Sequence, residues 1–157
     1  MSQSVVEKTK YINLLVTAIV VKDDKFLMIR EAKEHVYGQW NFPGGKIDWH
    51  EELNQAVKRE ALEETGYNIE LDDLLGVYYV AIDNYKGMTI RFIYWAHISD
   101  EIQHPLAKDV LLAEWKTKTE IKELLETKKL RSQMSERIAK AVLEDIHFPA
   151  SIVYELF

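Results

Sequence analysis

The chain has 157 residues, with 20 Lys and Arg against 26 Asp and Glu, and it contains no cysteine. This length predicts a single domain over residues 1–157 that is large enough to bury its own core. A net charge of −6 argues against stable nucleic-acid binding, which draws on clustered positive charge. The missing cysteines exclude disulfides and thiolate metal sites, so a bound metal would need oxygen or imidazole ligands.

No apolar run approaches the roughly 20 residues that a membrane-spanning helix needs, so no membrane association is expected. The first ten residues lack the basic start, apolar middle and small-residue cleavage site of a signal peptide. The absence of cysteine also fits a reducing compartment. We therefore expect a cytoplasmic protein.

The predicted elements, in chain order, are strands interrupted by a few helices. Residues 12–21 are rich in β-branched residues, and two aspartates then give a turn into a return strand at 25–30. A short strand at 40–42 stops at a Pro-Gly-Gly turn. The later strands are expected at 74–82, 88–98 and 111–116, and the helices at 52–65, 119–127 and 132–146. This order is not a strict βαβα alternation, so it favours an α+β fold or a mixed α/β sandwich.

The sequence indicates where the helix at 52–65 ends, but it allows two positions for its start. Gly66 is a natural residue to end it, because glycine readily adopts the left-handed conformation at that position. A pair resembling a capping box can form at its start in two ways, by Asp48 with Glu51 or by Glu52 with Gln55.

Three carboxylates crowd the end of this helix. Glu60, Glu63 and Glu64 fall within an arc of roughly 100° that overlaps the core-facing side. They repel one another and lie where the helix dipole is negative, so folding alone does not call for them. A hard divalent cation would remove the repulsion and would also bind phosphate oxygens. The alternative is a solvated helix end whose acids pair with Lys58 and Arg59.

The spacing around these acids is far more specific. Gly45 is followed after five residues by Glu51, and after seven more by the segment REALEETGY at residues 59–67. Over residues 45–67 the pattern resembles the Nudix box at every fixed position, with the aromatic Tyr67 in the final apolar slot. The preceding segment FPGGKI is similar to MutT-type members of the family. The resemblance implies the Nudix fold, an α/β/α sandwich around a central mixed β-sheet.

The resemblance also implies an activity. Nudix enzymes use Mg²⁺ or Mn²⁺ to hydrolyse a diphosphate linkage with a metal-activated water. The substrate would be a nucleoside di- or triphosphate or another small nucleoside diphosphate derivative. On that model Glu63 and Glu64 are the main metal ligands, Glu60 assists as ligand or base, and the Gly45 carbonyl completes the metal shell. A Nudix-fold module that binds a nucleotide without hydrolysing it is the second hypothesis, but the complete box favours hydrolysis.

Further roles follow from the same resemblance. Arg59 and Glu51 would pair and hold the helix against the preceding loop. An additional ligand or base is expected from outside the box, and Asp109, six residues before Trp115, is the first choice. Glu114 is the alternative, and either acid could instead be an ordinary solvated side chain.

Phosphate contacts are expected from the glycine-rich loop and from nearby cations. Lys46, beside Gly44 and Gly45, is the best placed to hold a phosphate. Arg30 and Arg91 are further candidates, although a salt bridge or solvent exposure is favoured for Arg91. The group attached to the diphosphate is expected to be selected by loops at 31–39, 83–87 and 100–110.

The C-terminal segment combines the helix at 132–146 with an apolar tail, PASIVYELF. Such a tail must be buried somewhere. Docking onto the core is favoured, and a homodimer contact is the alternative, because the resemblance includes many homodimers. Leu130-Arg131-Ser132, leading into this helix, is loosely similar to small Nudix phosphatases that act on nucleoside tri- and diphosphates.

Overall fold

The computed structural model describes residues 11–82, 87–100 and 104–155, and its centre is a six-stranded sheet. Across the sheet the order is β3-β2-β1-β5-β4, and β6 pairs with β2. β1 and β5 run parallel while the other neighbours run antiparallel, so the sheet is mixed. The strands are β1 Tyr11–Lys22, β2 Lys25–Glu31, β3 Trp40–Asn41, β4 Asn68–Ile82, β5 Gly87–Asp100 and β6 Val110–Thr117.

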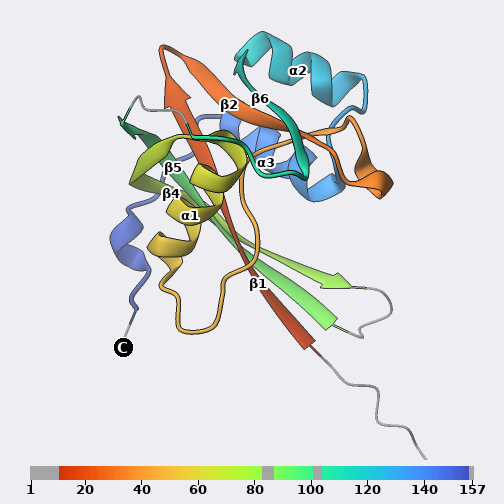
Figure 1. The fold of residues 1–157 in the computed structure, drawn as a ribbon. Helices are drawn as coiled ribbons and strands as arrows, with labels where there is room; N and C mark the ends of the chain where they lie inside the picture. The colour runs from red at the N-terminus through yellow and green to blue at the C-terminus, as the bar shows by residue number, and fades with distance from the viewer. Residues whose placement is uncertain (1–10, 83–86, 101–103, 156–157) are drawn as a thin grey trace, which may run out of the picture.

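Helices cover both faces of this sheet (Figure 1). Residues of α1 pack into one hydrophobic cluster with the sheet, and residues of α2 and α3 pack into the other. The three-layer α/β/α arrangement expected from the sequence is therefore confirmed. The helices are α1 Leu53–Thr65, α2 Lys118–Glu126 and α3 Gln133–Leu143, with short 3-10 turns η1 Glu34–Val36 and η2 Ala150–Ile152.

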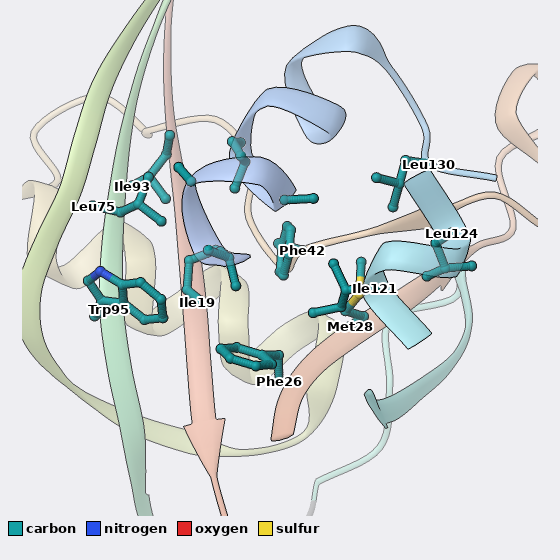
Figure 2. Close-up of a cluster of buried hydrophobic side chains, with 14 residues drawn as sticks. Ile19, Phe26, Met28, Phe42, Leu75, Ile93, Trp95, Ile121, Leu124 and Leu130 are labelled. Atoms are coloured by element: carbon teal, nitrogen blue, oxygen red, sulfur yellow. The ribbon is translucent and has the colours of Figure 1, made fainter. Parts of the chain in front are cut away.

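The two cores follow from the alternation of side chains along the strands. Successive residues of a strand point to opposite faces. Val16, Ala18 and Val20 of β1 accordingly pack with α1, whereas Ile19 packs with α2 and α3. Figure 2 shows the second of these clusters, where aromatic and aliphatic side chains from the sheet meet those of the helices.

Both capping pairs considered for α1 form, but in different places. Glu52 is the N-cap residue, and its backbone N–H donates to Gln55 Oε1 at 3.3 Å. The backbone N–H of Asp48 donates to Glu51 Oε2 at 3.0 Å within the preceding loop. Gly66 ends the helix with a φ of 78°, a conformation that glycine adopts without a steric penalty.

The largest boundary error concerns β4, which begins at Asn68 and not at 74. The charged run Leu71-Asp72-Asp73 lies within β4, which is irregular there and shifts its register against β5 between Leu71 and Leu74. Asp72 remains at the surface and contacts His97 of β5 at 2.8 Å. A bulged edge strand can accommodate such charged residues. The final helix is also shorter than predicted, since α3 ends at Leu143.

The tail after α3 docks onto the sheet and α1 as far as Glu155. Phe148 and Leu74 exchange two backbone hydrogen bonds of 2.8 Å each. Glu155 Oε2 accepts a hydrogen bond from the backbone N–H of Leu53 at 2.7 Å, where the positive end of the α1 dipole favours a carboxylate. Docking onto the core is thus confirmed in part: Ala150 and Val153 pack against the cluster of α1, whereas the large apolar side chains at 148, 152 and 154 stay exposed. The last two residues lie outside the described part of the chain. Within the described ranges, no helix is long and apolar enough to cross a membrane.

Ile121 of α2 is a test of the second core, since its side chain is fully buried. We expect Ile121→Ala to lower the free energy of unfolding by about 2–5 kcal/mol, because it removes apolar contacts and leaves a cavity. The exposed neighbour Lys122→Ala should change it by less than about 0.5 kcal/mol. Urea unfolding of the two variants measures both values, and equal losses would contradict the packing assigned to α2.

Candidate functional site

The acidic end of α1 is organised around the guanidinium of Arg59. Its Nε donates to Glu51 Oε1 at 2.7 Å, and its Nη2 donates to Glu51 Oε2 at 2.9 Å. Its Nη1 donates to Glu60 Oε1 at 2.9 Å and more distantly to Glu63 Oε2 at 3.4 Å. The predicted contact between Arg59 and Glu51 is therefore present. It raises the pKa of Arg59 and lowers the pKa of Glu51.

The three acids of α1 differ strongly in burial. Glu64 is 6% exposed, whereas the side chain of Glu63 is 52% exposed. The expectation that all three turn toward the core is wrong for Glu63, which lies at the rim. The alternative was a solvated helix end whose acids pair with Lys58 and Arg59. It is wrong for Lys58, which contacts Glu70 at 2.6 Å and none of the three acids.

Glu64 is held against the glycine-rich loop. Its Oε2 accepts a hydrogen bond from the backbone N–H of Gly44 at 2.7 Å. Burial nevertheless raises the pKa of Glu64 to about 8, and the hydrogen bond from Gly44 only partly offsets that effect. Burial likewise raises the pKa of Glu60. The buried acids of α1 thus lack full charge compensation from the protein.

Gly45 approaches α1 so closely that no side chain fits. A Cβ at this position would collide with the carboxylate of Glu60. The Gly45 carbonyl accepts the backbone N–H of Val16 at 2.9 Å, and the carbonyl of the next residue, Lys46, accepts Arg59 Nη2 at 2.9 Å. The loop is therefore fixed both to β1 and to α1.

These residues border a cleft of about 480 Å³. Its walls combine acids of α1, the glycine-rich loop and several cations from other elements. The lining residues are Leu15, Lys33, Gly44, Gly45, Lys46, Glu60, Glu63, Glu64, Arg91, Ala107, Asp109 and Arg131. All the acids and glycines predicted for the metal site, together with Lys46, meet in this one cleft.

Asp109 reaches the cleft because its loop is tied to the end of α1. The backbone N–H groups of His104 and Ala107 donate to the carbonyls of Gly66 and Glu63. Asp109 then lies 3.0 Å from Lys33 Nζ, and the hydrogen bond from Lys33 lowers the pKa of Asp109. Asp109 is therefore ionised and paired.

Glu114, the alternative to Asp109, is not among the lining residues. Its carboxylate contacts Lys116 at 2.7 Å on β6. The predicted pocket loops contribute Lys33 from 31–39, and Ala107 and Asp109 from 100–110. Residues 83–86 and 101–103 of those loops lie outside the described part of the chain.

Three cations of the cleft were missed or misjudged from the sequence. Lys33 had no motif to mark it, and Arg131 was noted only within Leu130-Arg131-Ser132, without a role at the site. Arg91 was expected to form a salt bridge or face solvent, but its Nη1 donates to Thr17 Oγ1 at 2.8 Å and its Nε is excluded from solvent. Arg30, by contrast, donates to the Gly38 carbonyl and does not line the cleft.

The oxygen atoms that line this cleft are of the type that a hard divalent cation prefers as ligands. They are carboxylate and carbonyl oxygens, and the buried ones carry charge that the protein compensates poorly. Among the described residues, however, no three His, Asp or Glu side chains are already grouped as a metal site. Arg59 and Gly44 hold several of the glutamate oxygens, so these carboxylates would have to turn toward an ion.

Comparison with known proteins identifies the family. A family model described as the NUDIX domain matches residues 13–139. The chain therefore belongs to the Nudix family. A NUDIX hydrolase from Nitrosomonas europaea has a similar fold, with a TM-score of 0.79 at 24% identity over 92% of this chain and 97% of that one.

Two relatives carry different names. An 8-oxo-dGTP diphosphatase of Buchnera aphidicola is 37% identical over 60 residues, 38% of this chain and 46% of that protein. An ADP-ribose pyrophosphatase of Methanocaldococcus jannaschii is 34% identical over 79 residues, 50% of this chain and 47% of that protein. The match spans less than half the length of either relative.

The raised pKa of Glu64 predicts a pH dependence of stability. Without metal, the folded protein keeps a proton on Glu64 up to about pH 8, whereas the unfolded chain releases it near 4.5. The folded state binds more protons in this window, so the free energy of unfolding should fall as pH rises from about 5 to 8. Glu64→Gln, which cannot ionise, should show a shallower fall.

Urea unfolding in EDTA at several pH values measures this slope. Glu126→Gln, on the exposed side of α2, is the matched control and should keep the wild-type slope. Parallel slopes for wild type and Glu64→Gln would show that Glu64 ionises at the same pH in both states.

Proposed function

We propose that this protein hydrolyses a diphosphate linkage in a nucleoside di- or triphosphate or a related nucleoside diphosphate derivative, with the aid of Mg²⁺ or Mn²⁺. The observation that carries the proposal is the cleft itself. The glutamates of α1 and the glycine-rich loop border it together with four cations, Lys33, Lys46, Arg91 and Arg131. Acids that suit a metal and cations that suit phosphate thus share one cavity of substrate size.

The glutamates have separate proposed roles. Glu63, at the exposed rim, and Glu64, on the buried side, would be the main side-chain ligands, with the Gly45 carbonyl beside them. Such an ion supplies positive charge at phosphate oxygens and lowers the pKa of a bound water. Glu51 would act through Arg59, whose position against the loop it fixes.

Two acids are candidates to take the proton of the attacking water. Glu60 has a raised pKa and lies directly against Gly45, so it is close to the proposed ligands. Asp109 is ionised through its pair with Lys33 and faces the cleft from another wall. We propose Glu60 as ligand or base and Asp109 as an additional ligand or base. Lys46, beside the loop, would hold a phosphate of the substrate.

The Nudix box does not identify the substrate, and the names of the relatives suggest which compounds to test first. A panel containing 8-oxo-dGTP, ADP-ribose, ordinary nucleoside di- and triphosphates and nucleotide sugars covers both names. Product release would be followed with Mg²⁺, with Mn²⁺ and with EDTA. The products also identify the phosphorus that is attacked.

Glu63→Gln and Glu64→Gln test the metal-site assignment on the best substrate of that panel. Each keeps the size of the side chain but removes a charged ligand. We expect each to lower kcat/KM by more than the roughly 10–100-fold that losing an outer partner of a metal ligand costs. Glu126→Gln should retain wild-type kinetics.

Full activity in both variants would overturn the assignment. Turnover that persists in EDTA would overturn the metal dependence. Nucleotide binding without turnover of any compound in the panel would instead favour a Nudix-fold binding module.

A further inference from the structure

Two arginines reach the cleft from outside the Nudix box. Arg91 comes from the middle of β5, and Arg131 comes from the segment just before α3. They are 40 residues apart in the chain and belong to different layers of the fold. No pattern in the box requires either of them, yet both line the cavity that contains the glutamates.

Arg91 is partly buried, and its hydrogen bonding is incomplete. Its Nη1 donates to Thr17 Oγ1 at 2.8 Å, but its solvent-excluded Nε has no hydrogen-bond partner among the described residues. Leaving a buried donor unpaired is costly, more so in a charged group. Burial, together with the charge of Arg131, lowers the pKa of Arg91 to about 10. Glu64 and Glu31 are near enough to oppose this decrease, but no carboxylate of the described residues forms an ion pair with Arg91.

Arg131 is held in place by an ion pair with a buried carboxylate. Its Nη1 lies 2.7 Å from Oε1 of Glu31, whose side chain is 1% exposed. Asn41 Nδ2 also donates to this carboxylate at 3.3 Å, and Ser135 of α3 donates to Asn41 at 2.9 Å. The guanidinium is thus oriented by a buried network while it borders the cleft. A guanidinium has five N–H donors, and the ion pair with Glu31 engages one end of it.

We propose that Arg91 and Arg131 together bind one phosphate group of the substrate. Guanidinium groups match the oxygens of a phosphate through paired hydrogen bonds, and they are weakly hydrated, so a partly buried pair suits this anion. A phosphate at the part of the guanidinium that lines the cleft would balance the charge of Arg91 and would offset the repulsion between the two cations. The pair would hold the phosphate chain at a second point and so select which phosphorus faces the glutamates.

The effect of the two arginines on catalysis rests on the proposed function, but the binding of phosphate can be tested without it. The probe is inorganic phosphate, added to the metal-free protein in EDTA at constant ionic strength. The readout is the Nε–Hε resonance of Arg91 in a proton–nitrogen NMR spectrum. We expect a saturable shift of this resonance in wild type, because an anion bound to the guanidinium changes the electronic environment of its Nε–Hε group.

The variants are chosen so that the buried charges stay balanced. Arg131→Lys keeps a cation beside Glu31 but loses the planar fork, and the double variant Glu31→Gln with Arg131→Gln removes both charges together. We expect each to weaken phosphate binding about tenfold or more. Arg137→Gln, which removes an exposed arginine of the adjoining helix α3, should bind phosphate as wild type does.

On a hydrolysed substrate, Arg131→Lys should raise KM or lower kcat/KM while the metal dependence stays unchanged. A panel in which the end phosphate is free or esterified shows whether the pair binds a terminal or an internal phosphate. If Arg131→Lys and the double variant bind phosphate as Arg137→Gln does, the inference is wrong even where hydrolysis is found. If no compound is hydrolysed but phosphate binding depends on Arg131, the inference stands and the proposed function fails.

Discussion

The bidentate pair between Arg59 and Glu51 holds the loop before α1 against the acidic end of that helix. The same guanidinium also contacts Glu60 and the carbonyl of Lys46, so one cation joins three segments of the site. Without it, the acids on this helix face would repel one another at the negative end of the helix dipole. The rest of the cleft depends on this contact, because it places the loop within reach of Glu64.

Close backbone approach is the second constraint. Gly45 passes so near Glu60 that a side chain would collide with the carboxylate, and Gly44 donates its N–H to Glu64. Two acids are consequently buried with less compensation than their charge requires, which raises the pKa of each. The protein thereby keeps oxygen donors in a site where a cation would stabilise them more than water does.

The acids and the cations that line the cleft come mainly from different elements of the fold. α1 supplies acids, whereas β5, the segment before α3 and the loop after β2 supply Arg91, Arg131 and Lys33. A metal held by the acids and a phosphate chain held by the cations would be complementary. The net charge of −6 is therefore no obstacle to an anionic ligand, since the local distribution of charge decides binding.

The sequence by itself determined the family, the helix that carries the box, and the meeting of Glu60, Glu64 and Gly45. These features are local, because fixed spacings on one helix and its adjoining loop set them. The predicted start of β4 was wrong, because a bulge accommodates Asp72 and Asp73 in the strand. Glu63 was predicted to face the core, but its side chain lies at the rim of the cleft. Tertiary structure alone decided which cations face the acids. Arg91 meets Thr17 across 74 residues, and Arg131 meets Glu31 across 100. Strand register and the packing of α3 create those contacts, and no local periodicity records them.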